Sequence, residues 1–141
     1  DPPKAEVLAA HGEAISRCFA HDEVRDTLEA LTKEDSVWSS QMLDVMRSAS
    51  PTSIMIAAKH YKDSQGEAFN EILHREFTVA QRILERVDLY EGIRTTIIDK
   101  ESEPIWDPIN FNYISTKDIE DYFVSTGYDL DQVQIFEERT G

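Results

Sequence analysis

The chain has 141 residues, of which 28 are acidic and 14 are basic, and its formal net charge is −14. Proteins that bind nucleic acid neutralise phosphates with lysine and arginine, so this balance argues against direct nucleic-acid binding. No apolar run approaches the roughly 20 residues that a membrane-spanning helix needs, so we expect no membrane span. Cys18 is the single cysteine, which excludes an intramolecular disulfide framework.

The spacing of apolar residues predicts helices joined by short polar turns along most of the chain. The first expected helix covers about residues 4–19. Asp22 can cap a second helix and Ser36 a third, because a short side chain with an oxygen atom accepts a hydrogen bond from the free N–H groups of a helix start. Ser50 followed by Pro51 predicts a fourth start, since proline at the first helical position gives up no hydrogen bond that the helix needs.

The fifth expected helix, about residues 67–87, has the clearest periodicity. Glu71 and Arg75 are expected to form an ion pair on it at the favourable i, i+4 spacing. Asp88 can cap a sixth helix. Gly92 lies inside that helix, where glycine costs about 1 kcal/mol relative to alanine, and we expect close approach of another backbone as its reason. The expected inward-facing residues are Phe69, Ile72, Leu73, Phe77, Ala80, Ile83 and Leu84 on the fifth helix and Leu89, Ile93 and Ile97 on the sixth.

Residues 99–114 lack periodicity, and two prolines flank Trp106. We expect an extended segment that lies over the surface and is held there by Trp106. Ser115 can cap a short helix after it, with Asp118 completing a capping box. Gly127 is the expected end of that helix.

These patterns together predict a fold class. Alternation with a period of two residues, bounded by turn dipeptides, is missing from the sequence. The chain is therefore predicted to be all-α, with about six to seven helices and an extended aromatic and proline-containing segment near the end. We divide it into a helical domain, residues 1–98, and a second part, residues 99–141, that holds the extended segment, a short helix and an acidic tail.

Local patterns for catalysis or metal binding are scarce. The histidines do not pair with one another or with Cys18 at the spacing of metal ligands, so we expect no metal site. The sequence contains no glycine-rich phosphate loop and no nucleophile elbow. Adjacent carboxylates lie in polar stretches and are interpreted as a solvated surface, and Asp99 is expected to have a structural role at the end of the sixth helix. The histidines in question are His11, His21, His60 and His74.

Five short segments, in their order and spacing, carry a family resemblance. They are Ile15-Ser16-Arg17-Cys18-Phe19-Ala20, Ser50-Pro51-Thr52-Ser53-Ile54, Arg75-Glu76-Phe77, Glu91-Gly92-Ile93-Arg94 with Ile98-Asp99-Lys100, and Trp106-x-Pro108. Together they resemble the C-terminal part of 3-hydroxyisobutyryl-CoA hydrolases, which belong to the crotonase (enoyl-CoA hydratase/isomerase) superfamily. Ala20 departs from the family pattern, which has serine there.

The resemblance implies the helical C-terminal portion of an acyl-CoA thioester hydrolase of valine catabolism. It implies packing, cover of the active site and association as the roles of this portion. The catalytic residues and the oxyanion hole would lie in an N-terminal crotonase core, so we assign no catalytic residue here and expect the chain alone to be inactive. No cofactor is expected, since the CoA thioester is the substrate of the parent enzyme. Lys100 is a candidate contact for CoA, and a solvent-exposed lysine is the simpler interpretation.

Two other functions stay open. One is a non-catalytic structural or protein-interaction module of a larger assembly such as a mitochondrial ribosome, where a charge of −14 suits protein contacts better than RNA contacts. The other is a free-standing helical adaptor, which leaves the five segments unexplained. The expected partner is the N-terminal crotonase core or another protein subunit, bound through an apolar helix face, with an oligomer as a further option. The expected location is mitochondrial in a eukaryote and cytoplasmic otherwise. The start at Asp1-Pro2-Pro3 suits a processed product, a fragment or the second part of a longer protein.

Overall fold

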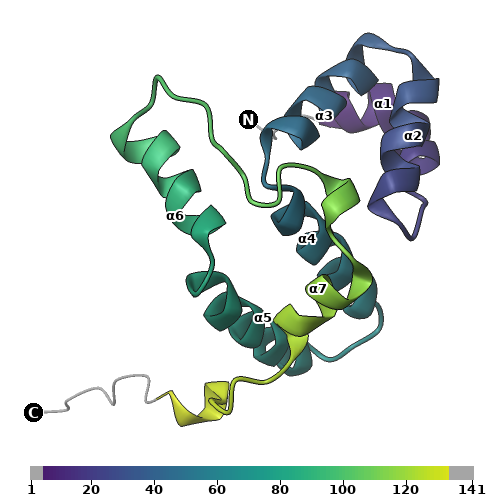
Figure 1. Ribbon diagram of the computed structural model, residues 1–141. Helices are drawn as coiled ribbons and strands as arrows, with labels where there is room; N and C mark the ends of the chain where they lie inside the picture. The colour runs from purple at the N-terminus through teal and green to yellow at the C-terminus, as the bar shows by residue number, and fades with distance from the viewer. Residues whose placement is uncertain (1–4, 134–141) are drawn as a thin grey trace, which may run out of the picture.

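The computed structural model describes residues 5–133, and over this range it consists of α-helices with short 3₁₀ and π-helical turns (Figure 1). The helices are α1 (Ala5–Cys18), α2 (Val24–Glu34), α3 (Val37–Ser48), α4 (Pro51–Asp63), α5 (Phe69–Leu84), α6 (Val87–Ile93) and α7 (Thr116–Glu120). A π-helix, Arg94–Ile98, continues α6, and 3₁₀ turns cover Phe111–Tyr113, Asp121–Phe123 and Leu130–Gln132. The described residues contain no strand, which confirms the all-α prediction. The end of the predicted acidic tail lies outside this range.

The predicted helix starts at Ser36, Ser50 and Ser115 are confirmed. Each hydroxyl accepts a hydrogen bond from the backbone N–H three residues later, at 3.1, 3.2 and 3.2 Å respectively. Asp118 completes a capping box with Ser115, as predicted. These starts were predictable because a cap is a local interaction within four residues of sequence.

Two predicted N-caps are wrong. Helix α2 has Glu23 rather than Asp22 at its N-cap, and α6 begins after Arg86 rather than after Asp88. Neither N-cap residue makes a side-chain hydrogen bond to its helix. Asp88 lies instead in the first turn of α6, where a negative charge is favoured by the helix dipole and where its carboxylate is available to other segments.

Two further details of the helices differ from the prediction. Arg75 on α5 pairs with Glu67, and the carboxylate of Glu71 accepts a hydrogen bond from the backbone N–H of Ala68 instead. Glu71 therefore caps the start of α5 instead of forming the predicted ion pair with Arg75. Helix α7 ends before Gly127, because a 3₁₀ turn follows it directly.

The buried side chains form two separate clusters. The first joins α1, α2 and α3, and it contains Cys18, Leu31, Trp38 and Leu43. The second joins α4, α5 and the segment around α7, and it contains Ile56, Val79, Ile114, Ile119 and Tyr122. The second cluster therefore draws on residues from both sides of position 98, where the sequence suggested a division.

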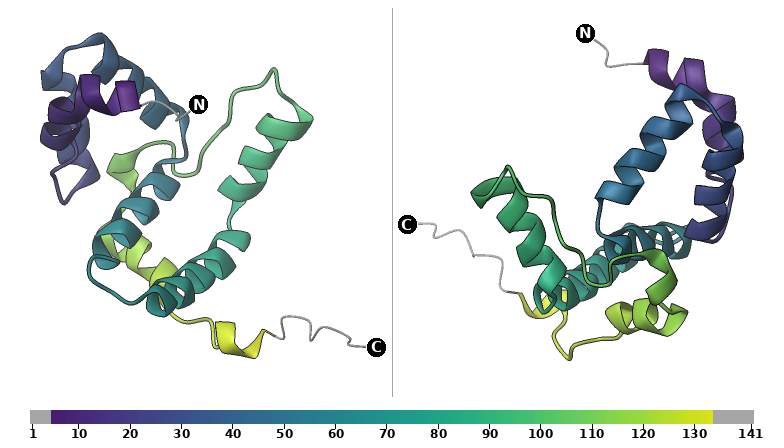
Figure 2. Two further views of the ribbon diagram at one scale, coloured as in Figure 1. Left: turned by 180° about the vertical axis from the view of Figure 1, so that it is seen from behind. Right: turned by 45° about the horizontal axis from the view of Figure 1, so that its top comes forward.

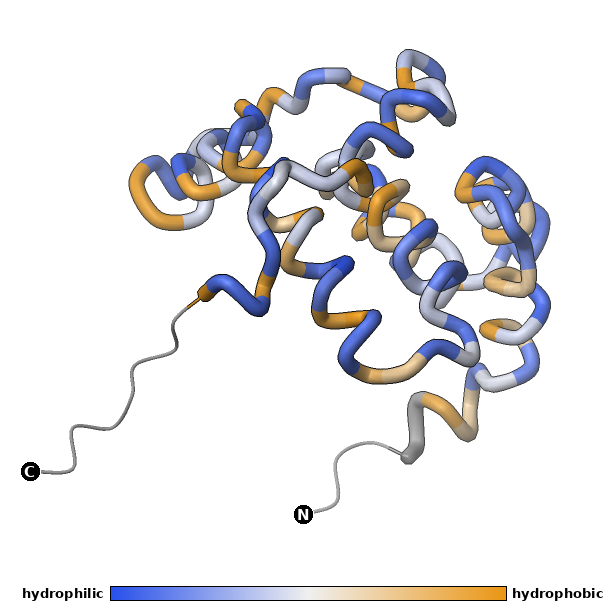
Figure 3. Tube along the Cα trace, turned by 90° about the horizontal axis from the view of Figure 1, so that it is seen from below, coloured by the Kyte–Doolittle hydropathy of each residue, from blue (hydrophilic) through white to orange (hydrophobic). Residues whose placement is uncertain are grey.

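The apolar stripe predicted for α5 is partly covered, since four of its seven residues are partly buried: Ile72, Leu73, Phe77 and Ile83. Val79, which the pattern did not include, is the one buried residue of this helix. Phe69, at the start of the predicted stripe, is 72% exposed. Figure 3 shows apolar residues spread along several helices. The helix periodicity was therefore correct, and the predicted face meets the described core in part, since Ile83 packs against the same cluster as Val79.

Helix α6 and the π-helix stand apart from α1–α3 in all the views of Figures 1 and 2, and residues 99–110 return from their tip toward α7. Ile97, predicted to face inward, is 66% exposed, and Ile93 is also exposed. The prediction for these two residues is wrong for the described part of the chain, because no element covers that side of the helix. Within residues 5–133, no helix combines the length and the apolar character needed to cross a membrane.

We predict that Leu31→Ala lowers the free energy of unfolding by about 2–5 kcal/mol, the usual range for a buried leucine truncated to alanine. Leu31 has no exposed surface and lies in the centre of the α1–α3 cluster, so its loss leaves a cavity. Urea unfolding followed by circular dichroism measures the change. Val45→Ala, at an exposed position of α3, is the control and should change stability by about 0.5 kcal/mol or less. Equal effects of the two variants would contradict this assignment of the core.

Candidate functional site

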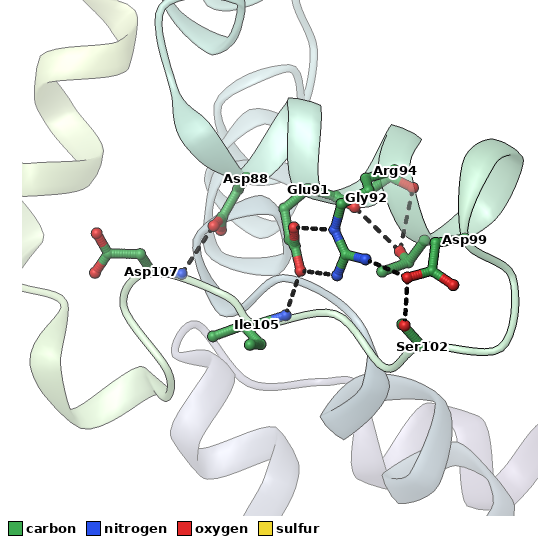
Figure 4. Close-up of polar contacts among 9 residues, drawn as sticks. Asp88, Glu91, Gly92, Arg94, Asp99, Ser102, Ile105 and Asp107 are labelled. Carbon is green, nitrogen blue, oxygen red and sulfur yellow. Dashed lines mark hydrogen bonds and ion pairs between the residues drawn. The ribbon is translucent and has the colours of Figure 1, made fainter.

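The two acidic residues of α6 that lie three positions apart, Asp88 and Glu91, hold the extended segment against the helix (Figure 4). Glu91 accepts a hydrogen bond from the backbone N–H of Ile105, and Asp88 accepts one from the N–H of Asp107, each at 2.8 Å. Residues three apart share a helix face, and N–H groups two apart point the same way in an extended backbone. The two carboxylates on one helix face therefore meet the two N–H groups on one side of the extended segment.

Glu91 is also paired with Arg94 in a two-pronged contact. Arg94 donates from Nε and Nη2 to the two carboxylate oxygens of Glu91, each at 2.8 Å. Its third nitrogen, Nη1, donates to Asp99 at 3.0 Å, and the hydroxyl of Ser102 donates to the same oxygen of Asp99 at 2.5 Å. We call these four residues and the N–H of Ile105 the Glu91 cluster. Asp99 therefore has the structural role that the sequence predicted.

The Glu91 cluster shifts the pKa of its central carboxylate. The hydrogen bonds from Arg94 are the largest cause, and the backbone N–H of Ile105 adds to them, so that the pKa of Glu91 falls from 4.5 to about 2. A carboxylate with so low a pKa stays ionised at neutral pH and is a poor proton donor or acceptor there. The cluster is therefore suited to fixing the backbone rather than to acid–base chemistry.

Trp106 joins three segments. Its indole Nε1 donates to the backbone carbonyl of Ser48, at the end of α3, at 3.0 Å. Its ring lies against Gly92 of α6, where an added Cβ atom would come within 3.4 Å of Cη2. The expectation that another backbone approaches Gly92 is wrong, because the neighbour is the Trp106 side chain. The predicted anchoring role of Trp106 agrees with these contacts.

Ser50 connects the start of α4 to the same region. Its hydroxyl donates to Asp88 at 2.6 Å while accepting the capping hydrogen bond of its own helix. Three of the sequence segments, around residues 50–54, 91–94 and 106–108, thus meet around Asp88. The sequence pattern predicted Asp88 only as a helix cap and not as their meeting point. Its position three residues before Glu91 on the same helix was the available signal.

A groove of about 450 Å³ opens beside this junction, between the start of α4 and the exposed side of α6. Its lining is mainly apolar and includes Ile56, Leu89, Ile93, Ile97 and Trp106. Grooves of this size and character suit the apolar part of a ligand or the side chains of a packed protein.

Lys100 and the two histidines His11 and His74 lie outside this junction. Lys100 is exposed on the turn after the π-helix, and it forms no ion pair with another residue of the range 5–133. His11 stacks on Trp38, with 5.4 Å between ring centroids. His74 Nδ1 lies 2.7 Å from a carboxylate oxygen of Asp129, a contact across 55 residues of sequence that no local spacing could have predicted.

The surroundings of His74 include one more carboxylate. Its Nε2 lies 3.6 Å from Asp131, so that both ring nitrogens face an acidic side chain. Both aspartates are exposed, and hydrogen bonding to the histidine accounts for the arrangement. The expectation that the chain has no metal site therefore stays a prediction.

We predict that Glu91→Gln destabilises the protein at neutral pH and that the difference from the wild type disappears in acid. The folded-state pKa of Glu91 lies below its ordinary value. Its contribution to stability is therefore complete above about pH 4.5 and is lost as the pH falls toward about 2. Urea unfolding at a series of pH values measures the difference.

The matched control for Glu91 is Glu120→Gln, which removes an exposed carboxylate at the end of α7. This variant should follow the wild type across the whole pH series. A constant difference between Glu91→Gln and the wild type from pH 7 to pH 2 would contradict the proposed role of the carboxylate charge.

We predict that Trp106→Ala loosens residues 99–110 and lowers the free energy of unfolding by less than about 3 kcal/mol, since the ring is only half-buried. Limited proteolysis should cut this segment sooner, while the helical circular dichroism signal changes little. Trp106→Phe is the control, because it keeps an aromatic ring against Gly92 and loses only the hydrogen bond to Ser48. Unchanged proteolysis in Trp106→Ala would contradict the anchoring role.

The sequence is similar to 3-hydroxyisobutyryl-CoA hydrolases of several organisms. The protein "3-hydroxyisobutyryl-CoA hydrolase, mitochondrial" of Mus musculus is 29% identical over 127 residues, which are 90% of this chain and 33% of the relative. The protein of the same name from Dictyostelium discoideum is 32% identical over 111 residues, 77% of this chain and 29% of the relative. The chain therefore spans about a third of the length of the curated relatives that it matches.

The fold also has a counterpart among solved structures. The crystal structure of a carnitinyl-CoA dehydratase from Mycobacterium thermoresistibile matches with a TM-score of 0.82 and 25% identity, over 92% of this chain and 37% of that chain. The helices thus have the arrangement of the helical C-terminal part of a crotonase-type protein, as predicted. A family profile described as Enoyl-CoA hydratase/isomerase matches residues 1–123, and the chain therefore belongs to this family.

Proposed function

We propose that this chain is the helical C-terminal portion of an acyl-CoA thioester hydrolase that resembles 3-hydroxyisobutyryl-CoA hydrolase and acts in valine catabolism. The observation that carries the proposal is the similarity to hydrolases of that name over 90% of this chain and 33% of the mouse relative. The portion would contribute packing, cover of the active site and association. The alternative, a structural module of a larger assembly such as a mitochondrial ribosome, is favoured by the structural use of the carboxylates in the Glu91 cluster.

The division of labour follows from the chemistry of thioester hydrolysis. Water adds to the thioester carbonyl, the C–S bond breaks, and CoA leaves as the thiol once a proton reaches its sulfur. The oxyanion that forms on the carbonyl needs aligned backbone N–H donors, and the water needs a base with a pKa near neutral. Glu91, with a pKa of about 2, does not suit that role. The catalytic groups would therefore belong to the crotonase core.

The uncovered apolar residues support a protein partner. Large apolar side chains are exposed on α1, α3, α5, α6 and the π-helix, and contiguous exposed apolar surface usually marks an interface. The proposed partner is the N-terminal crotonase core, through the groove between α4 and α6 and the exposed residues Phe69 and Leu84 of α5. A second protein subunit is the partner in the alternative function.

Two finer assignments belong to the same proposal. Lys100 is exposed beside the π-helix, and an ammonium group there could contact a phosphate of CoA, although the surrounding acidic charge opposes this contact. The proposed location is the mitochondrion in a eukaryote, which the names of the similar proteins support, and the cytoplasm otherwise.

We predict that the 141-residue chain alone hydrolyses 3-hydroxyisobutyryl-CoA no faster than buffer, because under the proposal the oxyanion hole and the acid–base groups belong to the crotonase core. Release of the CoA thiol, followed with a thiol-reactive dye, measures the rate, and the complete mouse hydrolase is the positive control. Hydrolysis by the purified chain well above the buffer rate would contradict the proposal.

The partner is tested by co-expression with the other two-thirds of the mouse relative. The proposal expects the two pieces to purify together and to hydrolyse the thioester, and it expects Ile93→Glu with Ile97→Glu to abolish both results. Co-purification without activity would favour the structural alternative.

A further inference from the structure

The segment that follows α7 lies along α5 and is held to it at two ends. We call this segment, residues 124–132, the strap. At its first end, Arg82 Nη2 donates to the backbone carbonyls of Val124 and of the next residue, each at 3.1 Å. At its second end, the strap contacts His74. Arg82 lies in the last turn of α5 and His74 about two turns before it, so the strap runs antiparallel to the helix.

The contacts at the first end do not change with pH near neutrality. The guanidinium of Arg82 stays charged, and the carbonyl groups that it contacts do not titrate. The hydroxyl of Thr126 donates to Oε1 of Gln81 at 2.6 Å, which is again a contact between groups that do not titrate. Gly127 follows with a φ of +88°, in the left-handed region that glycine adopts without strain. The strap therefore has a constant anchor and, directly after it, a residue about which the backbone can turn.

The contacts at the second end depend on the protonation of His74. Its Nδ1 lies 2.7 Å from Asp129 and its Nε2 lies 3.6 Å from Asp131. The backbone N–H of Asp131, followed by the His74 ring, holds the pKa of the Asp129 carboxyl below its usual value. A neutral imidazole has one donor nitrogen and one acceptor nitrogen, whereas a carboxylate only accepts. Two carboxylates that face both nitrogens are therefore satisfied together only by the doubly protonated ring.

The other charged groups around α5 are engaged elsewhere. The elements packed against this helix are α4, the segment around α7, and the 3₁₀ turns on either side of Gly127. The carboxylate of Glu71, one turn before His74, accepts the N–H of Ala68. Among the described residues, Asp129 and Asp131 are thus the charged partners of the His74 ring. The neighbouring pairs are His60 with Glu76, Lys59 with Asp63, Arg75 with Glu67, and Lys117 with Asp121.

We propose that His74 with Asp129 and Asp131 is a pH-sensitive latch for the strap. The doubly protonated ring holds both carboxylates, and the strap lies closed on α5. As the pH rises, the ring loses a proton to solvent, and one nitrogen becomes an acceptor that repels the carboxylate facing it. Residues 128–132 then turn away about Gly127, while the first end of the strap stays anchored. Release uncovers the side of α5 that carries the histidine.

The latch is independent of the proposed hydrolase function, because none of its groups is assigned to thioester hydrolysis or to the groove between α4 and α6. It acts on a different part of α5, and its test needs no substrate. Failure of the hydrolase proposal would therefore leave the latch standing, and the reverse also holds.

Leu130 reports the state of the latch without any substitution. It is partly buried, and it lies between the two aspartates in a 3₁₀ turn that contacts α5. Methyl relaxation measured by NMR on the 141-residue chain gives the order parameter of its side chain. Histidine changes its charge between about pH 5 and about pH 8, so the order parameter should fall by about a third or more across this range. Its midpoint should coincide with that of the imidazole signals of His74.

Three variants separate the latch from general effects of pH. His74→Gln keeps a hydrogen-bonding side chain without the charge, and Leu130 should be mobile at both ends of the pH range. His74→Arg keeps a positive charge throughout, and Leu130 should stay ordered at both ends. His21→Gln removes an exposed histidine in the turn between α1 and α2 and should respond to pH as the wild type does. Circular dichroism establishes that each variant is folded.

The outcomes support or overturn the latch without overlap. Loosening of Leu130 that follows the His74 titration and is lost in both His74 variants supports it. Equal order of Leu130 at both ends of the pH range in the wild type overturns it, as does an unchanged pH response in His74→Gln. Loosening with a midpoint away from that of the His74 signals also overturns it.

Discussion

The pairing of the Glu91 carboxylate with the Arg94 guanidinium and the Ile105 backbone N–H is the interaction on which the second half of the structure depends. The extended segment forms few backbone hydrogen bonds of its own, so the Glu91 carboxylate supplies a hydrogen-bond acceptor that its backbone would otherwise lack. With residues 99–110 fixed to α6, the Trp106 ring reaches α3 and the chain returns to α7. The returning chain then contributes Ile114, Ile119 and Tyr122 to the α4–α5–α7 cluster.

Most of the fold could be predicted from the sequence because its signals are local. The caps at Ser36, Ser50 and Ser115 depend on four residues each, and the apolar spacing within one helix depends on about a dozen. The structural role of Asp99 was also predictable, since its partner Arg94 lies five residues away. The family could be recognised for a related reason, because the five short segments keep their order and spacing along the chain.

The parts that could not be predicted depend on contacts between distant residues. Val79 is the most deeply buried residue of α5 because it packs in one cluster with Ile56 and with Ile119 and Tyr122, which lie about 40 positions later. The neighbour of Gly92 is Trp106, fourteen positions later, and the partner of His74 is Asp129. The apolar periodicity of a helix predicts which residues become buried, but it does not distinguish burial within the same chain from burial against a partner. This explains why Ile93 and Ile97 were expected inside the described fold and are found exposed.

The π-helix at Arg94–Ile98 has a geometric consequence for whatever covers this side of the molecule. The backbone N–H of Asp99 bonds to the carbonyl of Arg94 at 2.7 Å, five residues back instead of four. Because the hydrogen bond closes five residues back, each residue of this turn advances the side-chain direction by less than the roughly 100° of an α-helix. Ile97 therefore stays on the side of the helix that carries Leu89 and Ile93, and the three residues line one groove. A covering element can thus lie along one side of the helix from Leu89 to Ile97.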